Sequence, residues 1–400
     1  MRQRESSTRS VPVRRQGAAV PWAEARIIAG TAVQPLPATE VTVGQALGST
    51  LAEPLHARAA LPVQDVSAMD GYAVSGPGPW TLHGRILAGD RRSYPPVLPG
   101  TAVEVATGAA LPPGVTAVLP YEAAHRRDGL LRGPAVPGRH VRRRGEDCRP
   151  GQLLLPAGTP VTPAVLGIAA ATGHDALPVR LPPSVAAAVT GSELSTAGLP
   201  GPGRVRDAVG PMLPGLVDAL GGTLVRRDLL PDGAEVLREW LGGATADVLL
   251  LSGATSRGAA DHARPVLAAL GARILVPGVR CRPGHPQFLA LLPDGRCAVG
   301  LPGNPFAAMA ALLTLLGPLL QALAAGRPRP VRYARLAVAV PAHPVDTRLV
   351  PVRLAHGRAA PVGHDAPSLL LGAALADALA VVPPGGGAPV GEVELLPLPG

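Results

Sequence analysis

Residues 247–261 have the pattern of a buried strand that leads into an anion-binding loop. The apolar run 248–251 is typical of such a strand, small residues fill positions 252–258, and helical spacing from residue 259 places Asp261 in a first helical turn. A glycine-containing loop at a helix N-terminus directs backbone N–H groups toward a bound anion. We therefore expect this loop, with Arg257 inside it, to bind a phosphate or another oxyanion. An ordinary strand-to-helix connection would carry the same residues.

Glu193 and Asp261 are carboxylates at comparable positions. Thr190-Gly-Ser-Glu193 follows a predicted strand, and its Thr-x-x-Glu spacing is that of a capping box, in which Glu193 would hold the start of a helix. A carboxylate at the end of a strand can instead hold Mg²⁺, with Asp261 on the opposite side of the ion. The residues are consistent with both explanations.

Two proline-rich turns add groups that could contact an anion. In Leu301-Pro-Gly-Asn-Pro305, Asn304 can cap a helix that begins at Pro305, and Pro302-Gly303 forms a stiff loop that a ligand can approach closely. In Arg282-Pro-Gly-His-Pro286, the guanidinium fork suits an oxyanion, and His285 adds an imidazole. A solvated surface turn accounts for the second motif equally well.

These motifs need a sheet to bring them together, and residues 184–325 have the pattern of one. Strands and helices alternate, which predicts a three-layer α/β domain whose mostly parallel sheet is covered on both faces. Ligands bind beyond the carboxyl ends of such strands, where positions 190–193, Asp232, 252–261 and 302–304 would lie. The predicted strands are residues 185–189, 223–227, 248–251, 272–275 and 298–301, and the predicted helices are residues 211–220, 234–241, 259–270 and 305–316.

The remaining segments predict a multidomain chain of the α/β plus β class. Short β runs between glycines and prolines indicate a β-rich insertion domain, and β runs after residue 328 indicate a small C-terminal β domain. Helical spacing at 22–31 and 43–52, and a helix capped by Thr162 with Pro163 at its first position, indicate an extended N-terminal arm domain. We divide the chain into a disordered tail (1–17), the arm (18–50 and 140–180), the insertion (51–139), the α/β domain (181–326) and the C-terminal β domain (327–400).

Composition narrows the choice of function. The net charge is +9 and all 37 basic residues are arginine, but most are scattered, and aromatic residues make up only 2% of the chain. We therefore expect small anionic substrates and no nucleic-acid partner. Three cysteines without zinc spacing indicate a reducing compartment, and residues 1–17 lack the apolar segment of a secretory signal. Residues 306–326 carry no charge, yet a buried core helix explains them better than a membrane span, so we expect a cytoplasmic protein with no membrane partner.

Several motifs, in order along residues 20–398, resemble those of the molybdopterin molybdenumtransferases, the MoeA family that includes the E domain of gephyrin. They are Ser67-Ala-Met-Asp-Gly-Tyr-Ala-Val74, Ala106-Thr-Gly-Ala109, Arg144-Gly-Glu-Asp147, Thr190-Gly-Ser-Glu-Leu194, residues 252–261 and Leu301-Pro-Gly-Asn-Pro305. One such motif alone would carry little weight, whereas the whole set in this order is highly specific.

The resemblance implies an enzyme of molybdenum cofactor biosynthesis. It would use Mg²⁺ to insert molybdate, its substrate, into the dithiolene of adenylylated molybdopterin, with release of AMP. It also implies an α/β domain of the molybdopterin-binding type, a homodimer whose site is shared between subunits, and a molybdopterin adenylyltransferase as a partner. Carried over position by position, the catalytic residues would be Asp70, Thr107, Asp147, Asp232 and Asp261, the metal ligands Glu193 and Asp261, and the substrate-binding residues Gly191, Ser252, Gly253, Ser256, Arg257, Gly258, Arg282, His285, Pro302, Gly303, Asn304 and Pro305.

This chain departs from the family pattern at several positions. The glycine-rich loop carries Ala254 and Arg257, the Asp-Ser-Asn triplet is Asp207-Ala-Val209, and His285 replaces the second lysine of Lys-Pro-Gly-Lys-Pro. The family's Ser/Gly pattern is also poorly kept at residues 364–368. These changes leave open a degenerate paralogue that binds molybdopterin nucleotide, or acts as a scaffold, without inserting metal.

The acidic positions favour the enzyme over that alternative. Glu193, Asp232 and Asp261 are all retained. Arg257 offers a replacement for the lost lysine charge. We therefore interpret the chain as an active molybdenumtransferase.

Overall fold

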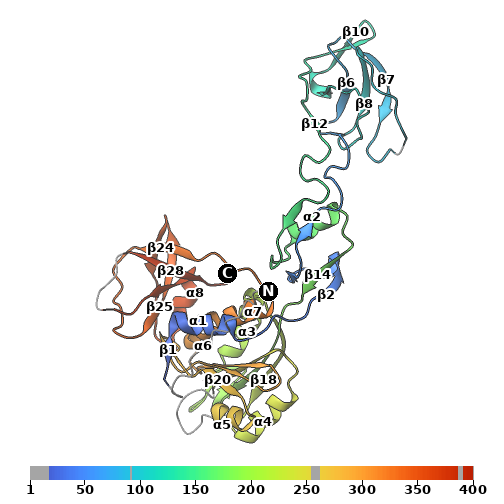
Figure 1. Ribbon diagram of the computed structural model, residues 1–400. Helices are drawn as coiled ribbons and strands as arrows, with labels where there is room; N and C mark the ends of the chain where they lie inside the picture. Colours follow the sequence, from blue (N-terminus) through green and yellow to red (C-terminus); the bar gives the residue numbers. More distant parts are fainter. Residues whose placement is uncertain (1–17, 91, 254–261, 386–390, 400) are drawn as a thin grey trace, which may run out of the picture. The chain divides into compact units, whose positions relative to one another are not determined.

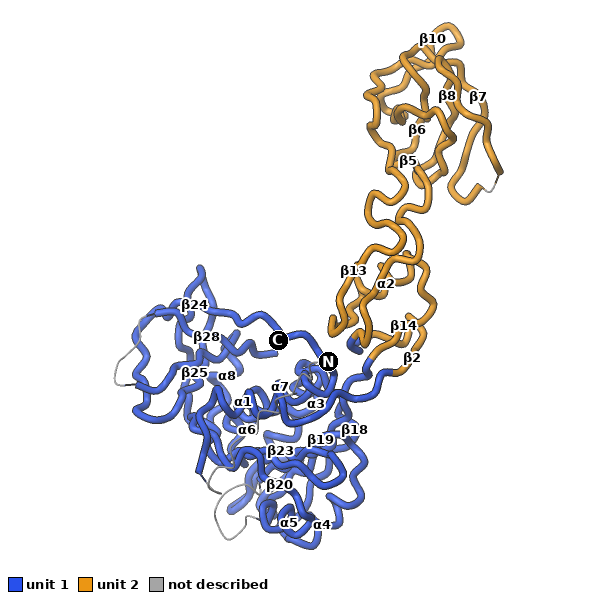
Figure 2. Tube along the Cα trace, in the orientation of Figure 1, with its two compact units in different colours: residues 1–38, 48–50, 180–400 blue, residues 39–47, 51–179 orange. Residues whose placement is uncertain are grey.

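We describe the protein from a computed structural model, which covers residues 18–90, 92–253, 262–385 and 391–399. Within these ranges the chain forms two compact units (Figure 2). Unit 1 comprises residues 18–38, 48–50 and 180–399, and unit 2 comprises residues 39–47 and 51–179. Each unit has hydrophobic clusters of its own.

Unit 1 contains a six-stranded sheet in the order β18-β15-β19-β23-β22-β20, and its two edge strands, β18 and β20, are labelled in Figure 1. Four neighbouring strands are parallel, namely β18 (Thr223–Leu230), β15 (Ser184–Thr190), β19 (Val248–Ser252) and β23 (Cys297–Leu301). β22 (Phe288–Leu291) is antiparallel to β23 and to β20 (Arg273–Val276), so β22 alone is reversed in this sheet. β22 is not predicted from the sequence, because its four residues follow the proline-rich turn directly.

Helices lie on both faces of this sheet. Alternate strand residues separate into two hydrophobic clusters, with Leu250 in the cluster that includes α3 and α6 and Leu249 in the cluster that includes α4 and α5. This alternation is the period-two pattern of a strand buried on both sides. The helices are α3 (Val209–Ala219), α4 (Ala234–Gly243), α5 (Ala263–Ala269) and α6 (Pro305–Ala311), which continues through a π-helical turn (Leu312–Leu316) into α7 (Gly317–Leu323).

The apolar helical stretch Pro305–Leu323 is a core element. It is long and apolar enough to cross a membrane, but 72% of its most apolar window is buried inside the protein. Leu312, Leu316 and Leu320 belong to the larger hydrophobic cluster of unit 1. The prediction of a buried helix is therefore confirmed, because the sheet and α1 supply the apolar surroundings that a bilayer would otherwise provide.

The C-terminal strands close into a five-stranded ring. β25 (Thr347–Ala355) pairs with β26 (Arg358–Pro361) and β27 (Ala378–Val382), while β24 (Arg332–Leu336) pairs with β26 and β28 (Glu392–Pro397), and β27 pairs with β28. A short helix, α8 (Leu371–Leu375), precedes β27. β21 (Val279–Arg282) joins this group by pairing with β25, and β1 (Val20–Pro21) pairs with β21. β21 therefore carries Arg282 from the α/β segment to the C-terminal strands.

The first helix, α1 (Trp22–Thr31), has the predicted bounds but lies in unit 1. Trp22, Ala25 and Ala29 are buried in the main cluster of unit 1, and the indole Nε1 of Trp22 donates to Thr314 Oγ1 at 3.1 Å. The sequence division had assigned residues 18–50 to the arm. Helical spacing reveals that a helix has an apolar face, but it does not reveal which core that face joins.

Unit 2 is built mainly from short strands. Its largest sheet has the order β7-β8-β6-β9, comprising β7 (Thr81–Ile86), β8 (Thr101–Val105), β6 (Gly71–Val74) and β9 (Ala117–Pro120). Thr162 caps α2 (Pro163–Ala171) as predicted, by accepting from Val165 N at 3.4 Å. The other short elements are β2 (Thr39–Thr42), η1 (Val43–Gln45), β4 (Leu55–His56), β5 (Val66–Ser67), η2 (Tyr121–Ala123), β10 (His125–Arg127), β11 (Leu130–Arg132), β12 (Val141–Arg142), β13 (Leu153–Leu155) and β14 (Ala176–Arg180).

The predicted helix at residues 43–52 is wrong. A single 3₁₀ turn, η1, occupies residues 43–45, and β3 (Thr50–Leu51) follows. Gly48 lies between them with a φ of +78°, a left-handed conformation that stops a right-handed helix. The periodic apolar residues of this segment therefore do not share a helical face.

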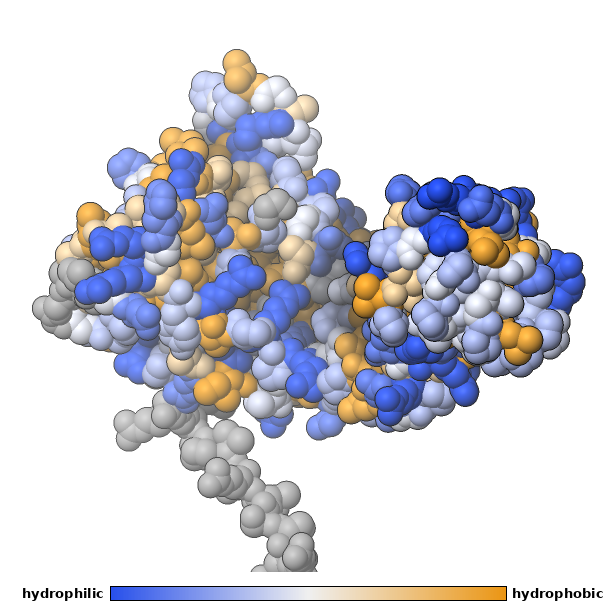
Figure 3. Space-filling model, turned by 90° about the horizontal axis from the view of Figure 1, so that it is seen from above, coloured by the Kyte–Doolittle hydropathy of each residue, from blue (hydrophilic) through white to orange (hydrophobic). Residues whose placement is uncertain are grey.

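The exposed surface of the described residues mixes polar and apolar side chains. On the face drawn in Figure 3, hydrophilic and hydrophobic residues are interspersed. Exposed leucines and isoleucines such as Ile27, Leu199 and Leu371 come from separate segments of the chain. Scattered apolar residues of this kind are normal on protein surfaces and need no partner.

Candidate functional site

The carboxyl ends of β15, β19 and β23 pack against one another. Thr190 Oγ1 donates to Ser252 O at 2.9 Å, and Gly253 N donates to Leu301 O at 3.4 Å. A Cβ on Gly253 would lie 2.1 Å from Thr190 O, and a Cβ on Gly303 would lie 3.6 Å from Gly253 Cα. The structure thus brings the loops that contain Gly191, Ser252–Gly253 and Pro302–Gly303 to one edge of the sheet.

The loop after β15 does not begin a helix, so the predicted capping box is wrong. Glu193 is followed by β16 (Leu194–Ser195), which pairs with β17 (Val205–Arg206), and Gly191 has a φ of +152°. Thr190 uses its hydroxyl on the neighbouring strand instead of on Glu193 N. The exposed carboxylate of Glu193 accepts no hydrogen bond from residues within the described ranges, which leaves it available to a ligand.

Asp232 holds this loop from the neighbouring strand. Its Oδ2 accepts from Ser192 N at 2.9 Å, and its own N–H donates to Ser192 Oγ at 3.3 Å. Asp232 follows β18, which pairs with β15, so sheet order alone places its carboxylate beside the Glu193 loop. Two predicted acidic residues therefore lie on adjacent loops.

The donor set fits Mg²⁺ bound mainly through a ligand. No group of three His, Cys, Asp or Glu side chains suited to a metal occurs among the residues that the structure describes. Mg²⁺ commonly keeps several waters and uses one or two carboxylates together with substrate phosphates. Glu193, with Asp232 beside it, can supply such a site. The other predicted ligand, Asp261, lies outside the described residues, as do Ser256, Arg257 and Gly258.

Three other predicted site residues, Asp70, Thr107 and Asp147, lie in unit 2. Asp70 Oδ1 accepts from Thr107 N at 2.6 Å and from Thr107 Oγ1 at 3.1 Å. Asp147 is held by its backbone, whose N–H donates to Leu61 O at 2.9 Å, and its side chain is exposed. The structure therefore brings Asp70 and Thr107 together within unit 2.

A cavity of about 720 Å³ lies in unit 1 beside the loop after β23. It is lined by Arg282, His285, Pro302 and Asn304, four of the predicted substrate-binding residues. Sequence reasoning missed its other polar residues, which come from the C-terminal segment: His343, Asp346, Arg348 and Asp365. The pairing of β21 with β25 brings the two groups together, and such a non-local pairing leaves no local signal in the sequence.

Arg282 is held through its Nε, and its two terminal nitrogens remain available to a ligand. Its Nε donates to Asp346 Oδ2 at 2.8 Å, and its terminal nitrogens have no partner among the described residues. The Arg282 side chain is 63% exposed, whereas that of Asp346 is 9% exposed. A guanidinium held in this way presents two parallel donors to an oxyanion.

His343 is a neutral member of the cavity wall. Its Nδ1 lies 2.9 Å from Asp346 N and 3.2 Å from Val345 N, and both of these backbone groups are donors. Nδ1 must therefore accept, so it carries no proton, and its 3.5 Å approach to Asp346 Oδ2 is not an ion pair. The remaining ring nitrogen, Nε2, then carries the N–H.

The first backbone N–H groups of α6 are hydrogen-bonded to another segment of the protein. Pro305 occupies the first helical position as predicted, but Asn304 makes no side-chain capping bond within the described part of the chain. Phe306 N and Ala307 N instead donate to Pro367 O, at 3.0 and 3.1 Å. The predicted capping role of Asn304 is therefore wrong, because a carbonyl from the C-terminal segment has taken its place, and its amide is left to face the cavity.

The thiol in the cavity wall is not a nucleophile. Burial, and then the charge of Asp346, raise the pKa of Cys281 to about 12. Its Sγ donates to Pro283 O at 3.3 Å and accepts from Gln287 Nε2 at 3.2 Å. Cys281 is therefore a protonated packing group at neutral pH.

Comparisons with known proteins agree with the family resemblance of the sequence motifs. Residues 20–173 match the MoeA N-terminal region (domain I and II), residues 186–322 a probable molybdopterin-binding domain, and residues 333–398 the MoeA C-terminal region (domain IV). Molybdopterin molybdenumtransferase 2 of Mycobacterium tuberculosis H37Rv is 36% identical over 323 residues, which cover 74% of this chain and 78% of that protein. Molybdopterin molybdenumtransferase of Nostoc sp. PCC 7120 is 32% identical over 302 residues, covering 71% and 69%.

Solved structures show the same relationship. A molybdopterin biosynthesis MoeA protein from Pyrococcus horikoshii superposes with a TM-score of 0.73 at 26% identity, covering 95% of this chain and 99% of that one. Another solved structure of a molybdopterin biosynthesis MoeA protein from Pyrococcus horikoshii OT3 gives a TM-score of 0.76 at 23% identity, over 94% of this chain and 100% of that one, and so supports the fold. The chain therefore belongs to the MoeA family of molybdopterin molybdenumtransferases, the enzymes of molybdenum cofactor biosynthesis whose motifs its sequence carries.

Proposed function

We propose that this protein inserts molybdate into the dithiolene of adenylylated molybdopterin and releases AMP. The observation that supports this most directly is the cavity beside the loop after β23, in which the open fork of Arg282 meets Asn304 and His285. A tetrahedral oxyanion needs several hydrogen-bond donors in a concave site, and this cavity supplies them. Buried Cys281 offers no competing thiolate.

The residues act mainly by positioning. Arg282 holds the molybdate oxygens through its two terminal nitrogens, while the Pro302–Gly303 loop lets a substrate approach the backbone closely. Gly191 and Gly253, at the packed ends of β15 and β19, have no side chain and so let the nucleotide part of the substrate approach the backbone closely. Holding the dithiolene and molybdate in one geometry lowers the barrier without a protein nucleophile.

Glu193 is the residue that we assign to Mg²⁺, with Asp261 as the second ligand and Asp232 orienting the loop. Mg²⁺, when bound, neutralises the negative charge of the substrate phosphates. Glu193 contributes a carboxylate that is free of protein donors in the described residues, and Asp232 keeps Ser192 in place. Ser256, Arg257 and Gly258 belong to the proposed anion loop.

We further propose a cytoplasmic homodimer in which Asp70, Thr107 and Asp147 of one subunit serve the site of the other. The resemblance of residues 67–74, 106–109 and 144–147 to motifs of the family supports this sharing. A molybdopterin adenylyltransferase is the partner that would supply the adenylylated substrate. We also propose the sequence-based division into tail, arm, insertion, α/β domain and C-terminal β domain for the subunit, with α1 moved from the arm to unit 1.

Complementation tests the proposed activity. The gene is expressed in a strain that lacks its molybdenumtransferase, and the activity of a molybdenum-dependent enzyme is measured at low and high molybdate. We expect restored activity at low molybdate, and release of AMP by the purified protein only when both substrates and Mg²⁺ are present. Failure to restore activity at low molybdate, together with no AMP release by folded protein, would overturn the proposal.

A further inference from the structure

The cavity contains two arginines, and a carboxylate contacts each of them differently. Asp346 accepts from Nε of Arg282 at 2.8 Å, which leaves both terminal nitrogens of that guanidinium available. Asp365 accepts instead from Nη2 of Arg348, which is one of the nitrogens that an oxyanion would use. Asp346 therefore orients Arg282 without using its terminal nitrogens. Asp365, by contrast, occupies one of the terminal nitrogens of Arg348.

Arg348 does not depend on Asp365 for its orientation. Its Nη1 donates to Pro341 O at 2.5 Å, and its side chain is only 24% exposed. A guanidinium that is partly buried and anchored through one terminal nitrogen already has a fixed direction. The carboxylate of Asp365, which is 33% exposed, adds a negative charge to the cavity.

The segment that carries Asp365 is firmly seated. Pro367 O accepts from Phe306 N and Ala307 N, so the segment also occupies the start of α6. At its base, a Cβ on Gly363 would lie 2.5 Å from Gly372 Cα, and a Cβ on Gly372 would lie 2.5 Å from His364 O. This close approach of two backbones fixes the segment, and residues 364–368 are those where the chain departs from the family's Ser/Gly pattern.

We propose that Asp365 sets the oxyanion affinity of the cavity by competing internally for Arg348, and that Asp346 is a positioning residue for Arg282. This inference rests on the proposed function, which places molybdate in the cavity. An incoming dianion must displace the Asp365 carboxylate or lie beside it, and like charges at such a distance repel each other. The cavity therefore binds molybdate more weakly than its two arginines alone would allow.

Equilibrium dialysis of molybdate against the full-length protein tests this inference, with Asp365→Asn and Asp346→Ala as opposed variants. We expect Asp365→Asn to lower the Kd about tenfold, which corresponds to ~1.4 kcal/mol, because the amide keeps the shape and removes the charge. We expect Asp346→Ala to raise the Kd by a similar factor, because Arg282 loses the acceptor that holds its Nε. A Kd for Asp365→Asn that equals or exceeds the wild-type value would overturn the proposal.

Three controls make every outcome informative. Asp294→Asn changes a comparable arginine–carboxylate pair, with Arg296, outside the cavity and should leave the Kd unchanged. If Asp365→Asn lowers the melting temperature, Asp365→Ser provides the same charge removal in a smaller side chain. Arg282→Ala and Arg348→Ala separate the two levels of inference: if neither weakens binding, the proposed oxyanion site itself is wrong, whereas weakened binding without tightening in Asp365→Asn refutes only the role of Asp365.

Discussion

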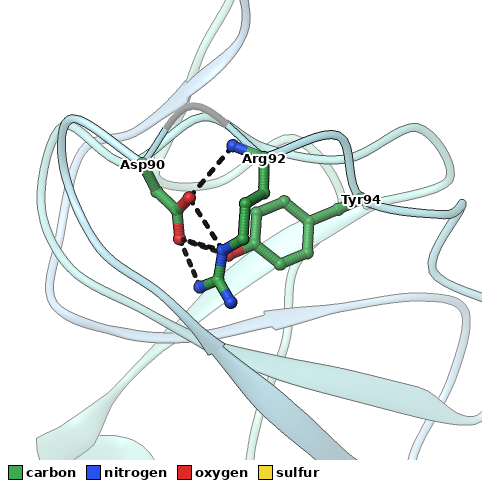
Figure 4. Close-up of polar contacts among 3 residues, drawn as sticks. All are labelled: Asp90, Arg92 and Tyr94. Carbon is green, nitrogen blue, oxygen red and sulfur yellow. Dashed lines mark hydrogen bonds and ion pairs between the residues drawn. The ribbon is translucent and has the colours of Figure 1, made fainter.

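Two polar clusters, one in each unit, use the same residue types in different ways. In unit 2, Asp90 contacts Arg92 and Tyr94 in the connection between β7 and β8 (Figure 4). Its Oδ1 accepts from Arg92 N and Nε at 3.1 and 3.0 Å, while Oδ2 accepts from Arg92 Nη2 at 2.6 Å and from the hydroxyl of Tyr94. The side-chain hydrogen bond from Arg92, followed by that from Tyr94, holds the pKa of Asp90 far below its usual range.

The cavity of unit 1 is assembled from distant residues and remains open. Arg282 and Asp346 are 64 positions apart, and the terminal nitrogens of Arg282 have no partner in the described part of the chain. In the Asp90 cluster, by contrast, every partner lies within four positions, and the carboxylate is saturated. Polar groups that satisfy one another within a single loop fix the conformation of that loop. Polar groups that come together because strands distant in the sequence pair can keep hydrogen-bond donors available for a ligand.

Removal of one arginine from each cluster should separate these roles most clearly. Arg282→Ala should reduce molybdate insertion about 100-fold or more, because it deletes donors aimed at the substrate. Arg92→Ala is the matched control and should leave turnover unchanged, since its contacts end within its own loop. Purified variants are compared by AMP release at saturating adenylylated molybdopterin. Equal losses in the two variants would contradict the distinction between open and saturated clusters.

Mixing of inactive subunits tests whether residues of both units serve one site. Asp70→Ala and Glu193→Ala homodimers should each be inactive. After subunit exchange, half of the dimers contain both variants, and each of these has one intact site, so activity should return to about a quarter of wild type. AMP release is measured before and after exchange, with self-mixed variants as the control. Activity that stays at zero after verified exchange would show that subunits do not share the site.

The sequence predicted the local parts of this arrangement well. The apolar runs of β15, β19 and β23 and the turn residues after them lie in consecutive positions, so spacing alone located Ser252, Gly253 and Pro302 at the edge of the sheet. The capping box failed because Thr190 found a partner on the next strand, Ser252 O, and Thr-x-x-Glu spacing cannot report that competitor.

The non-local part could not be predicted from the sequence. Asp346, Arg348 and Asp365 line the cavity only because β21 pairs with β25 and because Pro367 satisfies the start of α6. Neither feature has a fixed spacing from Arg282 in the sequence. The same limit applies to α1, whose bounds followed from periodicity while its place in the core of unit 1 did not.

A glycine in each unit allows a smaller comparison. Gly253 has a φ of +94°, and an added Cβ would lie 2.1 Å from Thr190 O, whereas Gly100 has a φ of +79° with nothing within 4 Å. Gly253→Ala should cost about 3 kcal/mol and reduce turnover, because left-handed strain and a backbone clash combine at the site. Gly100→Ala should cost about 1 kcal/mol, from the strain alone. Urea unfolding measures both, and equal costs would show that the strand ends at Gly253 can separate freely.

The smallest expected effect concerns Tyr121, which directly follows β9 in the four-stranded sheet of unit 2. Burial raises the pKa of Tyr121 to about 12, and its hydrogen bond to Glu104, 2.7 Å long, adds to the shift. Because the folded pKa lies above the unfolded value of about 10, the stabilisation is complete below about pH 10 and is lost as the pH rises through about 12. Absorbance titration of tyrosinate should show a step near pH 12 that Tyr121→Phe removes. If that variant keeps the step, the late ionisation belongs to another residue.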